Sequence, residues 1–134
     1  MSARSFFDTN VLLSVVSADA GKADHAEKLI AAGGAISIQV LNESANVARR
    51  QMGLSWAETR QLLQTIRALL SVHPVTAEVH ETGLSLAERY GLSVQDGMIA
   101  ASALTAECDT LWSEDMPHDL LLQGQLRIRN PFAE

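Results

Sequence analysis

The sequence predicts an α/β domain with a mainly parallel sheet, and three observations support this. Short apolar segments that suit buried strands alternate with longer segments of helical periodicity. Serine and threonine stand where several helices should start, and glycine where some should end. The 134 residues are 47% hydrophobic and contain no repeat, low-complexity tract or linker-like segment. We therefore expect one domain over residues 1–134.

The first half of the chain should alternate strand and helix. Ser5–Phe7 is a short apolar run that ends at an acid, and a pair of glycines, Gly33 and Gly34, should stop the second of the helices that follow it. The elements expected in order are a strand at Ser5–Phe7, helices over Val11–Val16 and Ala20–Ala32, a strand over Ala35–Ile38, and a helix from about Val40 to Met52.

The second half of the chain is expected to be richer in helix. Ser55, Thr76 and Ser93 are good helix caps, because a side-chain oxygen there can accept a backbone N–H bond. The elements expected in order are a helix from Ser55 to about Leu70, an extended piece over Val72–Val75, a helix ending near Gly91, a helix over Val94–Glu107, and strands at Thr110–Trp112 and Leu126–Ile128.

Four acids lie where the strands of such a sheet should end. Asp8 follows the first strand, and Asp115 follows the strand that contains Trp112. Glu43 lies early in the helix after the second strand, and Asp96 opens a late helix. Open α/β sheets bind ligands outside the carboxyl ends of their strands. These acids are therefore the candidate site.

Each acid also has an ordinary structural interpretation. Asp8 could simply cap a helix, as could Thr9 and Asn10 after it. Asp96 could be an acid favoured by the helix dipole, but it shares one helix face with small and apolar residues, where an uncompensated charge is costly. Glu43 shares its face with apolar residues in the same way, which predicts a half-buried acid that needs a partner.

The neighbours of the fourth acid are weaker candidates. Asp115 is preferred because it lies closest to the strand, whereas His118 and Asp119 come one turn later. Glu114 is expected to be solvated.

Cys108 is the only cysteine, lacks the companions of a zinc site, and is expected to be an ordinary buried thiol.

Composition and missing motifs exclude several classes of protein. The chain has no glycine-rich phosphate loop, nucleophile elbow or paired cysteines, which excludes nucleotide kinases, esterases and zinc folds. It has no apolar run near the length of a membrane span and no signal-peptide core, so we expect a cytoplasmic protein that does not bind membranes. A net charge of −6 argues against a broad electrostatic grip on nucleic acid, unless bound cations reverse the local sign.

Oxygen ligands alone indicate a hard cation. Carboxylates brought together repel one another and need a cation to stay ionised side by side. Magnesium or manganese suits such a ligand set, whereas zinc usually requires histidine or cysteine. We expect one or two ions, with a pair about 4 Å apart as one possibility.

The motifs that carry these acids resemble those of the PIN-domain ribonucleases, in particular the VapC-type toxins of bacterial toxin–antitoxin pairs. The resemblance covers nearly the whole chain, with the motifs in the family's order. The matching segments are Phe6–Leu13, Gln39–Glu43, Leu92–Leu104 and Leu111–Met116, followed by a family-like ending at Ile128–Phe132.

The resemblance implies a PIN-like three-layer fold and a metal-dependent endoribonuclease that hydrolyses RNA phosphodiesters with a metal-activated water. It also implies a cognate antitoxin as partner and a homodimer. By resemblance, the catalytic and metal-binding acids are Asp8, Glu43, Asp96 and Asp115, and the assisting residues are Thr9, Asn10 and Ser113.

Two other functions remain open at this point. One is a PIN-like module that binds RNA or protein without cleaving. The other is a phosphatase of the haloacid dehalogenase type, although that family's second aspartate is replaced by Asn10 and its downstream threonine by Leu12. Four arginines could contact phosphate or could simply be solvated, namely Arg49, Arg50, Arg60 and Arg67.

Overall fold

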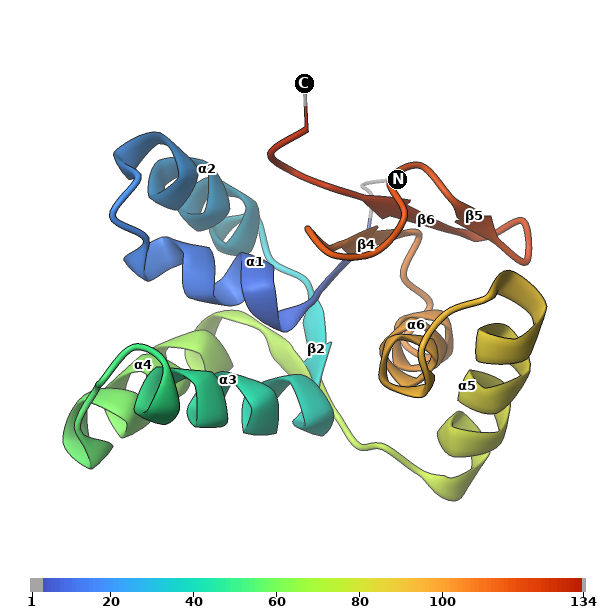
Figure 1. Ribbon diagram of the computed structural model, residues 1–134, viewed down its shortest axis with the longest axis horizontal. Helices are drawn as coiled ribbons and strands as arrows, with labels where there is room; N and C mark the ends of the chain where they lie inside the picture. Colours follow the sequence, from blue (N-terminus) through green and yellow to red (C-terminus); the bar gives the residue numbers. More distant parts are fainter. Residues whose placement is uncertain (1–3, 134) are drawn as a thin grey trace.

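A six-stranded sheet runs through the computed structural model, which describes residues 4–133 (Figure 1). Its strand order is β3-β2-β1-β4-β6-β5, and every neighbouring pair is parallel except β5 with β6. The strands are β1 (Ser5–Phe7), β2 (Ala35–Ser37), β3 (Ser71–His73), β4 (Thr110–Trp112), β5 (Leu121–Leu122) and β6 (Leu126–Arg129). The predicted mainly parallel sheet is confirmed.

Helices flank this sheet on both sides. Figure 1 shows α1 and α2 on one side of the central strands and α6 on the other, with α5 packed outside α6 and α3 beside α4. The helices are α1 (Thr9–Leu13), α2 (Ala20–Ala31), α3 (Ile38–Arg50), α4 (Trp56–Leu69), α5 (Ala77–Tyr90) and α6 (Val94–Thr105), with a 3-10 turn, η1, at Ser14–Val16. The predicted α/β class is therefore correct.

Helix starts follow the predicted caps closely. Ser55 forms a complete capping box with Glu58, and the side chains of Thr76 and Ser93 accept bonds from backbone amides in the first turns of α5 and α6. The start of α3 is an exception. Ile38 was expected in the strand but is the first helical residue, because Ser37 caps α3 by accepting a bond from the amide of Val40.

Two other expectations need correction. The helix expected over Val11–Val16 is shorter and earlier, because α1 begins directly after Asp8 and tightens into the 3-10 turn. Strand β5 was not predicted. It has only two residues, Leu121 and Leu122, so it shows no alternation, and it forms because a tight turn folds it back onto β6.

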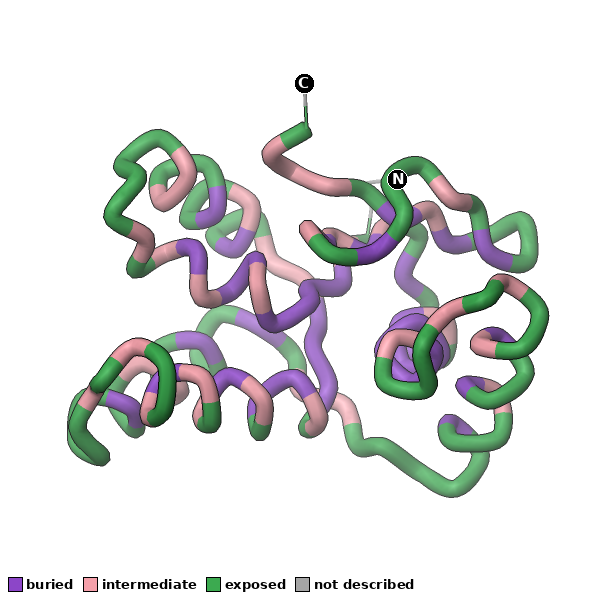
Figure 2. The backbone as a smooth tube through the Cα atoms, viewed as in Figure 1, coloured by how far each residue is buried: buried purple, intermediate pink, exposed green. Residues whose placement is uncertain are grey.

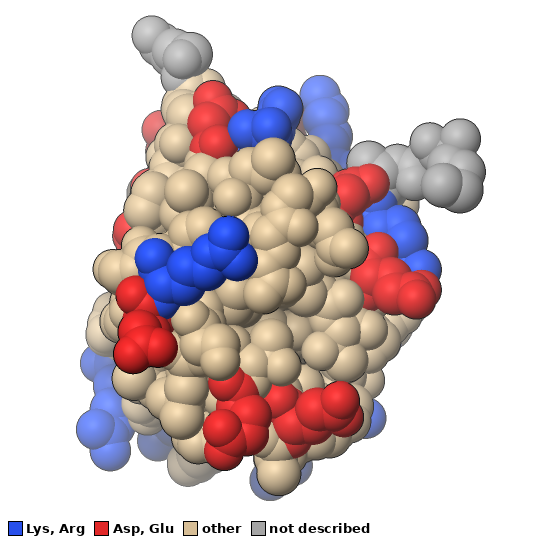
Figure 3. Space-filling view, turned by 90° about the vertical axis from the view of Figure 1, so that its right-hand side faces the viewer, with Lys and Arg blue, Asp and Glu red and all other residues tan. Residues whose placement is uncertain are grey.

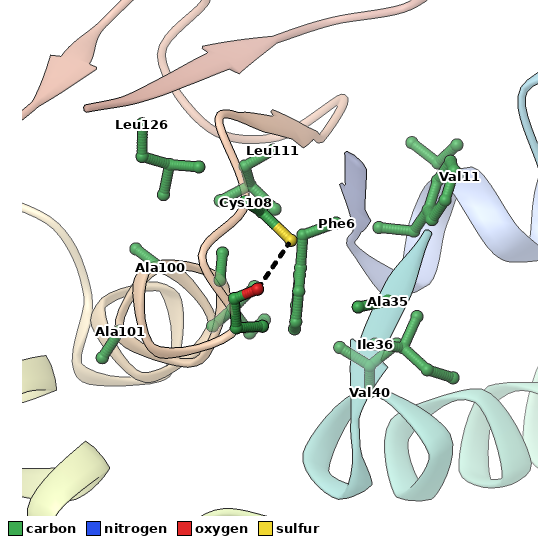
Figure 4. Close-up of a cluster of buried hydrophobic side chains, with 14 of the residues drawn as sticks. Phe6, Val11, Ala35, Ile36, Val40, Ala100, Ala101, Cys108, Leu111 and Leu126 are labelled. Atoms are coloured by element: carbon green, nitrogen blue, oxygen red, sulfur yellow. Dashed lines mark hydrogen bonds between the residues drawn. The ribbon is translucent and has the colours of Figure 1, made fainter. Parts of the chain in front are cut away.

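The core lies between the strands and their inner helices. Figure 4 shows Phe6, Ile36 and Leu111 within one apolar cluster, and each of the three is fully buried. Every residue from Gly97 to Ala103 in α6 is buried, and Figure 2 shows this helix enclosed while α5 keeps an exposed face. Cys108 is buried as predicted, and burial raises the pKa of its thiol to about 11.

Two glycines set the close approach of α5 and α6. A Cβ on Gly97 would lie 2.4 Å from the carbonyl oxygen of Gly83, and a Cβ on Gly83 would lie 2.5 Å from the sulfur of Met98. A side chain at Gly97 would therefore force the helix backbones apart. Because Asp96 precedes Gly97, this contact also fixes where the third candidate acid lies.

The face of the molecule on the α5 side is unevenly charged but not strongly basic. Figure 3, which views the molecule from its α5 side, shows separate acidic and basic groups on a mostly uncharged surface, and the described residues on this face form no continuous basic patch. Within residues 4–133, no helix has both the length and the apolar character needed to cross a membrane.

Candidate functional site

The four predicted acids line one pocket at the carboxyl ends of β1 and β4. The pocket has a volume of about 320 Å³, and α1, α3 and α6 also contribute to its wall. It is lined by Asp8, Thr9, Asn10, Leu13, Glu43, Val47, Gln51, Gln95, Asp96, Ile99 and Asp115. Asp8 and Asp115, which are 107 positions apart in the chain, thus lie in the same pocket. This is the edge of the parallel sheet at which the sequence predicted a site. We call this hollow the acidic pocket.

Asp8 is the most buried of the four acids, with 5% of its surface exposed. One carboxylate oxygen accepts a bond from the amide of Thr9 at 2.7 Å, and the other accepts from the hydroxyl of Ser113 at 2.8 Å. Burial raises its pKa to about 6; the two hydrogen bonds oppose this rise, while the charges of Asp96 and Glu43 add to it. Asp8 therefore caps α1 and also lines the pocket.

Glu43 has the partner that its half-buried position requires. The hydroxyl of Thr9 donates to one carboxylate oxygen at 3.0 Å, and the side-chain amide of Gln39 lies 3.4 Å from the other. The prediction of a half-buried acid on the apolar face of a helix is confirmed. Thr9 thus links two of the acids, because its backbone amide binds Asp8 and its side-chain hydroxyl binds Glu43.

Asn10 fixes the loop that carries the fourth acid. Its side-chain nitrogen donates to Asp115 at 2.9 Å and lies 3.5 Å from Asp8, while its side-chain oxygen accepts from the backbone amide of Glu114 at 3.1 Å. The hydroxyl oxygen of Ser113 accepts from the amides of Asp115 and Met116, each at 3.3 Å. The expected assisting positions, Asn10 and Ser113, are thus hydrogen-bonded to the acids.

Asp96 lies in the first turn of α6, where the side chain of Ser93 accepts a bond from its amide at 3.1 Å. Its carboxylate lines the acidic pocket. Burial raises the pKa of Asp96, as do the charges of Asp115 and Glu43, whereas the side-chain hydroxyl of Ser93 lowers it. A carboxylate that faces other carboxylates is favoured in its charged form only when a cation is near.

The donor chemistry of the pocket fits magnesium or manganese. Within residues 4–133, no three His, Cys, Asp or Glu side chains converge closely enough to form a ready-made metal site. Magnesium does not require such a cage, because proteins commonly hold it through one or two carboxylates with water filling the other positions. The four acids of the pocket offer only oxygen ligands, and a zinc site would usually need histidine or cysteine.

Other residues near the fourth acid have structural roles. Glu114 was expected to be solvated, and this was wrong: its carboxylate pairs with the ammonium of Lys22 at 2.9 Å, and both side chains are about two-thirds buried. His118 accepts a bond from the amide of Asn130 and lies 3.4 Å from Asp119. Neither His118 nor Asp119 lines the acidic pocket.

Sequence reasoning missed the glutamines of the site. Gln51 and Gln95 line the acidic pocket, and Gln39 reaches both Glu43 and the backbone oxygen of Gln95. Only Gln39 carried a local signal, because it lies four residues before Glu43 on the same helix face. The pairing of Lys22 with Glu114 spans 92 residues and left no local signal.

The model of the PIN domain family matches residues 5–117, which contain all four acids and the whole acidic pocket. The chain belongs to the PIN-domain family. The family predicted from the motifs is therefore confirmed, as is the fold that it implied. No curated protein matches the sequence.

Several solved structures share this fold. A toxin–antitoxin complex from Klebsiella pneumoniae aligns with a TM-score of 0.73 at 19% identity over 98% of each chain. FitAcB from Neisseria gonorrhoeae aligns with a TM-score of 0.68 at 20% identity, over 96% of this chain and 98% of that one. VapC20 of Mycobacterium tuberculosis, a toxin that cleaves the sarcin–ricin loop, aligns with a TM-score of 0.63 at 19% identity, over 83% of this chain and 91% of that one.

Proposed function

We propose that this PIN-domain protein is a metal-dependent endoribonuclease that acts as the toxin of a toxin–antitoxin pair. The observation that carries the proposal is the gathering of four acids from separate elements into one pocket. Burial or mutual repulsion raises the pKa of two of them, Asp8 and Asp96. Carboxyl groups whose pKa is raised by their surroundings are typical of functional sites.

In the proposed reaction, Asp8, Glu43, Asp96 and Asp115 hold one or two magnesium or manganese ions. When bound, the metal supplies an activated water and positive charge for the phosphodiester. The hydroxyl of Thr9 orients Glu43, and the amide of Asn10 orients Asp115, so their oxygens face the pocket before any ion arrives. This preorganisation lowers the cost of assembling the site.

The substrate is proposed to be RNA. The chain carries a net charge of −6, so a phosphate backbone can approach the acidic pocket only if cations neutralise it. The similar fold of VapC20, whose name describes cleavage of the sarcin–ricin loop, supports a structured RNA as the first substrate to test.

The proposed partners are an antitoxin and a second copy of this chain. The alignment with the toxin–antitoxin complex from Klebsiella pneumoniae supports the antitoxin. Exposed apolar side chains at the starts of α3 and α6, namely Ile38 and Val94, provide surface for self-association. A monodisperse monomer in solution, both alone and with the product of the neighbouring gene, would contradict these partners.

The two alternatives are less well supported. In a phosphatase of the haloacid dehalogenase type, a second aspartate serves beside the nucleophile, but here Asn10 uses its amide to bind Asp115 and has no proton to exchange at neutral pH. A module that binds without cleaving has no need to retain a buried acid with a raised pKa such as Asp8.

The proposal is tested by cleavage of a pool of structured cellular RNAs with manganese, with magnesium or with EDTA. Wild type should cut in metal only, and Asp8→Asn and Asp96→Asn should each reduce cutting by more than about 100-fold, since loss even of groups that support metal ligands costs 10–100-fold. Asp19→Asn is the matched control, because Asp19 caps α2 outside the pocket and asparagine caps equally well. Full cutting by both pocket variants would refute the proposal.

A further inference from the structure

A second hollow adjoins the acidic pocket along α3. It has a volume of about 610 Å³ and reaches the start of α4. It is lined by Asn42, Glu43, Ala45, Asn46, Arg49, Arg50 and Trp56. We call it the Trp56 groove. Glu43 lines both hollows, so the groove begins where the acidic pocket ends.

Trp56 is unusually exposed for a tryptophan, at 62%. It is the first residue of α4, directly after the Ser55 cap. The guanidinium carbon of Arg49 lies 4.4 Å from the ring centre of Trp56. Arg49 also donates a hydrogen bond to the backbone oxygen of Leu54 at 2.7 Å. Arg49 therefore holds the indole in place from one side while much of its surface stays open to solvent.

The groove differs in charge from the pocket that it adjoins. Arg49 and Arg50 bring two positive charges from the last turn of α3, in a chain whose net charge is −6. Asn42 and Asn46, one helical turn apart, add two exposed side-chain amides. The groove thus combines a cation for a phosphate, an aromatic face for a base, and amides for the edge of a base.

We propose that the Trp56 groove binds an unpaired nucleotide of the RNA substrate beside the cleavage point, with its base stacked on Trp56 and its phosphate against Arg50. The inference rests on the proposed nuclease function. Helix rise places Arg50 about 10 Å from Glu43 along α3, so the groove receives a neighbouring nucleotide and not the scissile bond. Single-stranded RNA is commonly recognised in this way, by stacking on aromatic side chains within a positively charged groove.

A protein segment is the competing occupant of the groove. The side chains argue for the nucleotide, because five of the seven described lining residues are charged or carry a side-chain amide, and Trp56 is the one large apolar residue among the seven. An amphipathic protein segment would be expected to need several apolar contacts in a row. The two occupants also differ in what they require of residue 56: stacking needs an aromatic ring, whereas a protein segment needs only apolar surface.

The test measures binding of a short single-stranded oligoribonucleotide in EDTA, so that no cleavage is required. The chain has two tryptophans, and Trp112→Phe leaves Trp56 as the reporter of stacking by fluorescence quenching. We expect quenching by the single strand and much less by the same sequence in a duplex. For variants that lack Trp56, binding is measured by the fluorescence anisotropy of a dye-labelled oligoribonucleotide. Trp56→Leu should weaken binding at least about fivefold, and Trp56→Phe should retain most of it. Melting temperatures check that each variant folds.

The arginine gives an independent readout. Arg50→Ala should lower the dependence of log affinity on log salt by about 0.7, the value for one phosphate contact on a single strand. Arg89→Ala is the matched control, because Arg89, like Arg50, is an arginine in the last turn of a helix but lies outside both hollows. It should leave affinity and salt dependence unchanged.

The outcomes separate this inference from the proposed function. Wild type that cuts RNA in metal, with Trp56→Leu binding and cutting equally well, would overturn the groove assignment alone. Fluorescence of Trp56 that responds to added antitoxin or to protein concentration, but not to RNA, would overturn it in favour of a protein occupant. Wild type that neither binds nor cuts RNA would overturn both.

Discussion

Replacement of Asp8 by asparagine should stabilise the metal-free protein while it abolishes activity. Asp8 is 5% exposed and accepts bonds from the Thr9 amide and the Ser113 hydroxyl. An asparagine of the same shape can accept the first bond with its side-chain oxygen. Its amide nitrogen takes the place of the oxygen that accepts from Ser113, whose own oxygen already accepts from the amides of Asp115 and Met116, so the second bond is lost while the buried charge is removed.

The size of the effect follows from the pKa. Burial raises the pKa of Asp8 from 3.8 to about 6, a difference of about 2 pH units, and each unit corresponds to 1.36 kcal/mol. Because the folded pKa lies above the unfolded one, the folded state holds the proton more tightly. Protonation of Asp8 therefore stabilises the fold fully below about pH 4, and this stabilisation is lost as the pH rises to about 6. At pH 7 the ionised carboxylate costs on the order of 3 kcal/mol.

The assay is urea unfolding of wild type and Asp8→Asn in EDTA, at several values between pH 4 and pH 7.5. The variant should be less stable than wild type by about 1 kcal/mol at the lowest pH, because the bond with Ser113 is lost. Relative to wild type it should gain about 3 kcal/mol between the lowest and the highest pH, and it should therefore be the more stable protein at pH 7.5. Asp19→Asn, which changes an exposed cap on α2, should show no such trend. A variant that is less stable than wild type at pH 7, or a difference that does not change with pH, would refute the reasoning.

Three further predictions concern the residues around the acids. Ser113→Ala should cost about 1–3 kcal/mol in urea unfolding, because it removes one of the hydrogen bonds of the buried Asp8 and leaves the amides of Asp115 and Met116 without their acceptor; an unchanged midpoint would contradict this. Gly97→Ala should destabilise by at least about 1–3 kcal/mol, since its Cβ would meet the Gly83 carbonyl oxygen. Gly21→Ala in α2, where the added Cβ makes only ordinary contact, should be neutral or stabilising, and similar losses in both variants would show that the helix contact is not tight. Manganese should raise the melting temperature more at pH 7.5 than at pH 5, because protons on Asp8 and Asp96 compete with the metal; an equal rise at both values would place the metal elsewhere.

The parts of the fold that could be predicted from sequence are those with local physical causes. Ser55, Thr76 and Ser93 marked helix starts correctly, because a cap is a contact between residues three apart. Asp8 was found at the end of a strand because a parallel sheet gathers such positions at one edge. The two-residue β5 carried no such pattern, since it exists only by pairing with β6.

The parts of the site that could not be predicted depend on contacts between distant residues. Glu114 looks like an ordinary loop acid until Lys22, on α2, lies 2.9 Å from it. Gln51 and Gln95 look like solvated helix residues until the fold brings both to the acidic pocket. Glu43 and Asp96 were identified because a charge on an apolar helix face is costly without a partner, whereas a neutral glutamine carries no such cost.

The measurement that tests the central claim most directly is manganese binding by wild type, Asp8→Asn, Asp115→Asn and the control Asp19→Asn. Manganese binding is measured by isothermal titration calorimetry at pH 7.5 in the absence of RNA. If the acidic pocket is one metal site, wild type and Asp19→Asn should bind one or two ions with a saturable affinity, and both pocket variants should lose that binding. Absence of saturable binding in wild type, or equal binding by all four proteins, would contradict the assignment of these acids as a metal-dependent nuclease site.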